Sequence, residues 1–250
     1  MPRDAAGTNL AGSVNAGRPS IATSLGDIRA RIAAAARRSG RDPAAITLIG
    51  VVKTVAPEHV REAVAAGLTD LGENRVQEAA EAVAELGRES ARWHMIGHLQ
   101  RNKAGRALEL FDRVHGIDDA GLAEALSRRA QAGGRVLPVL VQVNVSEEAT
   151  KFGVAPQELT GLVAQVARLP GLALDGIMSI GPPVTRAEDA RPFFVRTREL
   201  RDAAERETGA RLPHLSMGMS GDFEVAVEEG STMVRIGTAL FGARPTPPGS

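Results

Sequence analysis

A lysine at the end of an apolar run is the first residue of this chain that could do chemistry. Residues 46–53 read ITLIGVVK, so that a run of strand-forming residues ends on Lys53. Burial disfavours the charged form of an amine and leaves a neutral nucleophile that condenses with an aldehyde. The same run also fits a lysine that leaves the strand into solvent, and the run alone does not separate the two interpretations.

Two segments late in the chain are suited to phosphate. SMGMSGD at residues 216–222 and RIGTALFG at residues 235–242 place glycine and hydroxyl residues directly after apolar runs. In barrel folds the loops after the last two strands often bind phosphate through backbone N–H groups. The glycines would also serve tight turns that bind nothing. Combined with the amine of Lys53, the segments indicate a ligand that carries an aldehyde and a phosphate.

Two further polar segments have structural explanations. Asn74 precedes a helical segment and Gln77 follows three residues later, a spacing typical of a helix N-cap. His94 and His98 are four residues apart, which suits a metal site on a helix. Here the first histidine falls in an expected strand and the second lies beyond its end, so we predict no metal site.

The composition argues against several classes of protein. The chain has no cysteine, which excludes disulfides, thiolate metal sites and a cysteine nucleophile. Lys and Arg total 30, as do Asp and Glu, so no net field attracts nucleic acid or an anionic membrane. No apolar run approaches the ~20 residues of a membrane span, and the N-terminus does not resemble a signal peptide. We therefore expect a cytoplasmic protein that binds neither nucleic acid nor a membrane.

Short apolar runs alternate with amphipathic helical segments along the chain. Strands are expected at 46–52, 69–72, 92–96, 113–117, 137–144, 172–179, 214–217 and 232–236. Helices are expected at 20–39, 57–66, 75–86, 99–110, 120–131, 156–169, 188–208 and 222–229.

This alternation predicts an α/β fold with parallel strands. We expect a single-domain (β/α)₈ TIM-type barrel with one preceding N-terminal helix, in which the strand ends face one mouth. An open doubly wound sheet is the alternative, but neither a G-x-G-x-x-G fingerprint nor a complete P-loop is present. The barrel is expected over residues 20–244, between disordered tails at 1–19 and 245–250.

Four blocks of the sequence together resemble the pyridoxal phosphate homeostasis protein family. They begin with VVKTVAPEHVREAVAAGLTDLGENRVQEA and continue with WHMIGHLQRNK, VLVQVNVSEEATKFG and HLSMGMSGDFEVAVEEGSTMVRIGTALFG. The resemblance runs in register from about Ile46 to Arg244. It implies a barrel like the N-terminal domain of alanine racemase, with pyridoxal 5'-phosphate as the cofactor.

The resemblance also implies roles for individual residues. Lys53 would hold the cofactor as an aldimine, while Ser216, Gly237 and Thr238 would hold its phosphate. Arg235 would lie near the pyridine nitrogen or the phosphate, and Asn74 would line the ring. An arginine beside that nitrogen keeps it unprotonated, which weakens the ring as an electron sink.

A storage and delivery role in cofactor homeostasis, with little or no catalytic turnover, follows from what the chain lacks. Racemases of the similar barrel need a second base, normally a tyrosine, and the related decarboxylases need a cysteine; the chain has neither. We expect a monomer that passes pyridoxal phosphate to recipient apoenzymes, with Lys103 and Lys151 either taking part in exchange or simply solvated. A true pyridoxal phosphate enzyme and a Schiff-base aldolase remain as alternatives.

Overall fold

The computed structural model describes residues 19–146, 148 and 150–242. The expected tails at 1–19 and 245–250 lie outside these residues, except for Pro19. No helix in the described part of the chain is long and apolar enough to cross a membrane.

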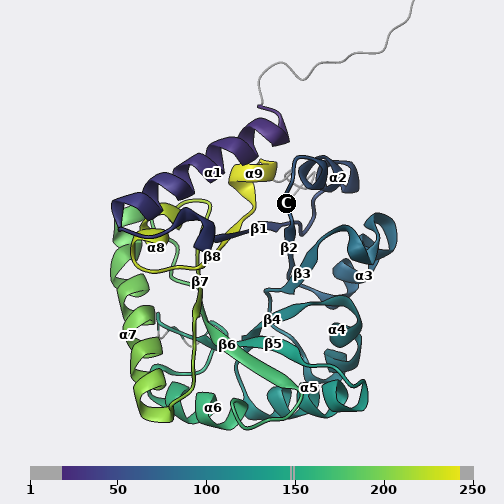
Figure 1. Cartoon of the computed structure of the whole chain (residues 1–250), viewed down its shortest axis with the longest axis vertical. Coiled ribbons are helices and arrows are strands. Elements are labelled where there is room, and N and C mark those ends of the chain that lie inside the picture. The colour runs from purple at the N-terminus through teal and green to yellow at the C-terminus, as the bar shows by residue number, and fades with distance from the viewer. Residues whose placement is uncertain (1–18, 147, 149, 243–250) are drawn as a thin grey trace, which may run out of the picture.

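Parallel strands close into a barrel in which the order in space follows the order in sequence, and β8 pairs with β1. The ring of strands is visible at the centre of Figure 1. This confirms the predicted TIM-type barrel. The strands are β1 Thr47–Val51, β2 Asp70–Glu73, β3 Arg92–Met95, β4 Arg113–Ile117, β5 Leu137–Val143, β6 Leu172–Ser179, β7 His214–Met219 and β8 Met233–Ile236.

Helices surround the strands, as expected from their amphipathic patterns (Figure 1). They bury their apolar faces against the barrel, because apolar residues that recur every three or four positions lie on one face of a helix. The helices are α1 Ile21–Arg38, α2 Pro57–Ala65, α3 Val76–Leu86, α4 Ala104–Leu110, α5 Ala120–Ala132, α6 Leu159–Val166, α7 Arg191–Thr208, α8 Phe223–Glu228 and α9 Thr238–Phe241.

Helix α1 is the predicted helix that precedes the barrel, and it packs across α8, α9 and α2. Ser20 caps its N-terminus by accepting a hydrogen bond from the backbone N–H of Thr23 at 3.1 Å. Its polar face is tied to α8 by ion pairs from Arg31 to Glu224 and from Arg38 to Glu228. The helix therefore covers the outside of the barrel between α8 and α2.

Three predicted helices begin later than the sequence indicates, and one helix was missed. The segments at 99–110, 156–169 and 188–208 each start with a short 3₁₀ turn, at Arg101–Lys103, Pro156–Glu158 and Ala187–Ala190. Helix α9 has four residues, too few for an amphipathic repeat to be recognised. It follows directly from β8 and so lies at the barrel mouth.

Strand β7 extends two residues beyond the predicted end at Met217. The register with β8 shifts between Ser216 and Met219, as in a β-bulge, and the strand continues through Gly218. Gly218 has φ 91°, which favours glycine, and a Cβ there would lie 2.5 Å from the Cβ of Ala226. The strand therefore ends at Met219, directly before Ser220.

Candidate functional site

The polar strand ends converge on a cavity of about 280 Å³ at the barrel mouth. Lys53 lies two residues beyond β1, and Arg235 belongs to β8. We call this the Lys53 cavity. It is lined by Val51, Lys53, Val55, Met219, Ser220, Gly221, Arg235, Gly237, Thr238, Phe241 and Gly242.

The backbone next to Lys53 is strained. Thr54 has φ 60°, and within the described ranges it is the one residue other than glycine with positive φ. That conformation is a true outlier for a β-branched residue and costs roughly 1–3 kcal/mol. The strained turn directly follows the half-buried Lys53 and lies between β1 and α2.

A buried carboxylate lies close to this amine. Glu73 ends β2, is 2% exposed, and accepts a hydrogen bond from the backbone N–H of Asn74 at 3.1 Å. Burial raises the pKa of Glu73 to about 7, and the positive charge of Lys53 opposes that shift only in part. The carboxyl group is therefore able to gain or lose a proton near neutral pH.

Arg235 supplies a buried cation to the same cavity. The residue is 4% exposed, and it donates hydrogen bonds to Ser216 Oγ at 2.7 Å and to the carbonyl of Ser179 at 2.8 Å. Burial lowers the pKa of Arg235 to about 10, so the guanidinium stays charged at neutral pH. No carboxylate forms an ion pair with it in the part of the chain that the structure describes. A buried cation without such a partner is well placed to bind an electron-rich ligand.

The turns after β7 and β8 meet at the rim of the cavity. The backbone N–H of Ala239 donates to Ser220 Oγ at 3.1 Å, which joins the two turns. Gly237 and Thr238 begin α9, where the first backbone N–H groups have no partner within the helix. Together these groups offer N–H and hydroxyl donors to an anion.

Four of the six predicted site residues thus line one cavity: Lys53, Arg235, Gly237 and Thr238. Ser216 does not, because its hydroxyl lies beneath Arg235 and is bonded to Arg235 and His115. Asn74 does not line the cavity either. Its predicted role as a helix cap is wrong, since Arg75 is the N-cap residue of α3 and no side chain caps that helix.

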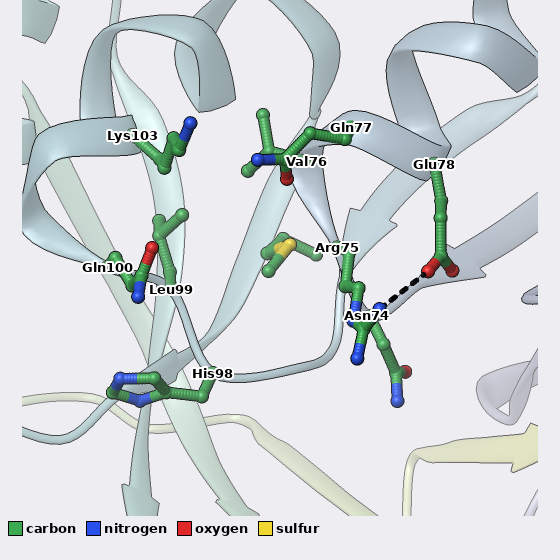
Figure 2. Close-up of a pocket in the computed structure, with 10 residues that line it drawn as sticks. Asn74, Arg75, Val76, Gln77, Glu78, His98, Leu99, Gln100 and Lys103 are labelled. Carbon is green, nitrogen blue, oxygen red and sulfur yellow. Dashed lines mark hydrogen bonds and ion pairs between the residues drawn. The ribbon is translucent and has the colours of Figure 1, made fainter.

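Asn74 lines a neighbouring hollow of about 460 Å³ between the β2–α3 and β3–α4 connections. We call it the Asn74 cavity. Its basic residues are Arg75, His98 and Lys103, and their side chains point in different directions in Figure 2. Arg75 pairs with Glu78, and His98 pairs with Asp118 and stacks on Phe152 at a ring distance of 4.1 Å.

Comparison with known proteins identifies the family of this chain. The family model described as "Alanine racemase, N-terminal domain" matches residues 23–245. The pyridoxal phosphate homeostasis protein of Pseudomonas aeruginosa is 46% identical over 224 residues, covering 90% of this chain and 96% of that protein. This chain belongs to the pyridoxal phosphate homeostasis protein family.

Two solved structures place this family member among its structural relatives. PipY of Synechococcus elongatus PCC7942, solved with PLP bound, is 37% identical with a TM-score of 0.79, covering 89% of this chain and all of PipY. An alanine racemase of Clostridium difficile 630 is 15% identical with a TM-score of 0.70, covering 91% of this chain and 58% of the racemase. The racemase shares the fold alone.

Sequence reasoning missed Ser220 and Glu73 as residues of the site in this family member. Ser220 stands in the quoted SMGMSGD segment, and an allowance for a bulge at Gly218 would have placed it at the strand end. Glu73 was noted at a strand end, but nothing in the sequence shows that it is buried beside Lys53.

Proposed function

We propose that this chain binds pyridoxal phosphate in the Lys53 cavity and acts in intracellular cofactor homeostasis by storing and delivering it. The observation that carries the proposal is the buried cation of Arg235, which forms no ion pair within the described residues and lines the same cavity as Lys53. The relatives named for pyridoxal phosphate homeostasis and the PLP-bound PipY structure support the choice of ligand.

The cavity offers residues for both the aldehyde and the phosphate of such a ligand. The cofactor supplies an aldehyde that forms a carbon–nitrogen double bond with an amine and releases water. Lys53 would provide that amine as the Schiff-base partner. Gly237, Thr238 and Ser220 would hold the phosphate through backbone N–H and hydroxyl groups. Arg235 would donate to the ring nitrogen and keep it unprotonated.

The cavity favours a carrier over an enzyme. Among its described lining residues, Lys53 and Arg235 are the ionisable ones, and an arginine with a pKa of about 10 does not act as a base near neutral pH. A racemase needs bases on both faces of the substrate carbon, and this lining offers Lys53 alone, because Glu73 lines a different hollow. We therefore propose little or no turnover, and a cytoplasmic monomer that hands the cofactor to recipient apoenzymes.

The proposal is tested by locating the bound cofactor. The purified protein is loaded with pyridoxal phosphate, reduced with borohydride and digested, and the modified peptide is identified by mass spectrometry. We expect the label on Lys53. A label confined to other lysines would refute the assignment.

A second measurement tests the carrier role. The loaded protein is incubated with single amino acids and, separately, with an apoenzyme that requires pyridoxal phosphate. We expect the apoenzyme to gain activity while the amino acids are not racemised. Sustained racemisation by the purified protein would make it an enzyme.

A further inference from the structure

A line of buried hydrogen bonds crosses the inside of the barrel from Arg235. Ser216 Oγ lies 2.7 Å from Arg235 Nη1 and 2.9 Å from His115 Nδ1. His115 Nε2 is 3.0 Å from His94 Nδ1, and His94 Nε2 is 2.9 Å from Asp70 Oδ1. These five residues, the barrel relay, come from β8, β7, β4, β3 and β2, and none is more than 4% exposed.

The far end of the barrel relay is a carboxylate that can only accept hydrogen bonds. Arg92 donates to both oxygens of Asp70, at 2.9 and 2.7 Å, and Thr69 donates at 2.7 Å. Hydrogen bonds from His94, Arg92 and Thr69 outweigh burial and hold the pKa of Asp70 well below its usual range. An ionised carboxylate has no proton to give, so His94 Nε2–H must be the donor.

The remaining bonds then have only one possible direction. Burial lowers the pKa of His94 and His115, so both rings are neutral and each has one donor nitrogen and one acceptor. His94 Nδ1 therefore accepts from His115 Nε2–H. His115 Nδ1 accepts from the Ser216 hydroxyl, whose oxygen accepts from Arg235. Every polar group of the line is satisfied with Arg235 as donor at one end and Asp70 as acceptor at the other.

An extra proton would break this order. Both imidazole nitrogens of each ring are already used, so a protonated His115 would have to donate to Ser216. The serine oxygen would then accept from two cations, and its own hydrogen would lose its partner. The positive charges of Arg235 and Arg113 also face His115 and oppose a charge there, as would a charge on His94 or His214.

We propose that the barrel relay positions Arg235, with Ser216, His115 and His94 acting as positioning residues that fix the guanidinium toward the Lys53 cavity. A guanidinium held by one donor-to-acceptor line has a single orientation in which its remaining N–H groups are free for a ligand. The ligand part rests on the proposed function, since pyridoxal phosphate would be the group that Arg235 meets.

The first test reads the tautomers directly in protein without cofactor. ¹⁵N-labelled histidine spectra near neutral pH are compared with those of the His115→Phe variant to assign the signals. Both His94 and His115 are expected as neutral rings protonated at Nε2. A cationic His115, or one protonated at Nδ1, would overturn the direction of the relay whether or not the protein binds pyridoxal phosphate.

The second test removes the link next to Arg235. Ser216→Ala is expected to weaken pyridoxal phosphate binding by about tenfold to a hundredfold, because Arg235 loses a buried charge-assisted partner. Ser216→Thr keeps the hydroxyl and is expected to stay within about threefold of the wild type. Lys53 is untouched, so the absorbance of the bound cofactor should persist at saturation.

The variants also separate the two ideas. Unchanged affinity in Ser216→Ala would overturn positioning by the relay while leaving the proposed function intact. A wild-type protein that fails to bind pyridoxal phosphate would remove the proposed function, and the spectra would still decide the direction of the relay. Should Ser216→Ala not fold, His94→Phe serves instead. This variant is expected to bind pyridoxal phosphate more weakly and to show a second tautomer of His115. Wild-type affinity together with an unchanged His115 signal would refute the proposal.

Discussion

The Lys53 cavity and the Asn74 cavity both lie where barrel strands end, yet they differ in how their charges are held. In the Lys53 cavity the guanidinium of Arg235 is buried and fixed by two hydrogen bonds. In the Asn74 cavity the side chain of Arg75 is 75% exposed and pairs with Glu78 (Figure 2). A buried cation that forms no ion pair is costly without a ligand, whereas a solvated pair needs none.

The larger hollow is therefore the poorer candidate for a cofactor. The Asn74 cavity has about 460 Å³ against about 280 Å³ for the Lys53 cavity. Volume alone does not orient a ligand, while fixed donors and a strained turn do. The contrast predicts that equivalent substitutions in the two cavities have unequal effects.

The largest difference is expected between the two lysines. Lys53→Ala should abolish the absorbance of the lysine-bound cofactor and reduce retention of pyridoxal phosphate to non-specific levels, because the covalent link is lost. Lys103→Ala, in the Asn74 cavity, should leave both unchanged. Spectra of the two variants after loading and gel filtration make the comparison. Loss of the band in Lys103→Ala alone would exchange the roles of the cavities.

The two arginines should differ next. Arg235→Lys is expected to weaken pyridoxal phosphate binding by about a hundredfold, because a lysine ammonium cannot reproduce the two fixed bonds of the guanidinium. Arg75→Lys should change affinity less than twofold, since its partner is a solvated carboxylate. Fluorescence titration of both variants gives the two ratios. Equal losses in the two variants would mean that burial of the charge does not distinguish the cavities.

How far the sequence predicts this comparison depends on the kind of information required. The barrel and its strand ends follow from apolar runs alternating with helical stripes, and Lys53 follows from the point where the first run stops. Local patterns of that kind are fixed by residues close together in the chain. For the same reason Arg235, Gly237 and Thr238 were placed at the mouth.

The sequence was least informative where the answer depends on segments far apart in the chain. The phosphate role of Ser216 was implied by the family resemblance, and nothing near it in the sequence shows that its hydroxyl contacts Arg235 and His115, the latter 101 residues away. His94 was considered only for metal binding, although its partners are on β2 and β4. Which side chains meet inside a barrel is set by register and closure, which a single sequence does not state.

The titration of Glu73, the residue directly before Asn74, allows the surroundings of Lys53 to be probed by pH. Its pKa of about 7 in the folded protein lies above the ordinary value of 4.5, so the folded state binds more protons between these values. Folding stability from this group is present below about pH 4.5 and is lost as the pH rises through 7.

Glu73→Gln removes this titration and keeps an acceptor for the N–H of Asn74. The free energy of unfolding of the variant relative to the wild type is expected to be roughly 2 kcal/mol higher at pH 8 than at pH 5. Urea unfolding without cofactor measures both values. Glu109→Gln in α4 is the control, with a change below about 0.5 kcal/mol because its ion pair with Arg106 is exposed. A constant difference between Glu73→Gln and the wild type at both pH values would mean that Glu73 is ionised throughout.

The smallest effect on binding is expected from the strained turn that follows Lys53. Thr54 is exposed and has φ 60°, a conformation that glycine adopts freely. Thr54→Gly should stabilise the protein without cofactor by about 0.5–1 kcal/mol, because the relieved strain exceeds the added chain entropy of glycine. The same freedom loosens the direction of Lys53, so pyridoxal phosphate should bind severalfold more weakly. Thermal unfolding measures the expected gain in stability of this variant, and titration measures its expected loss of affinity. A gain in both stability and affinity would show that the strain does not contribute to binding.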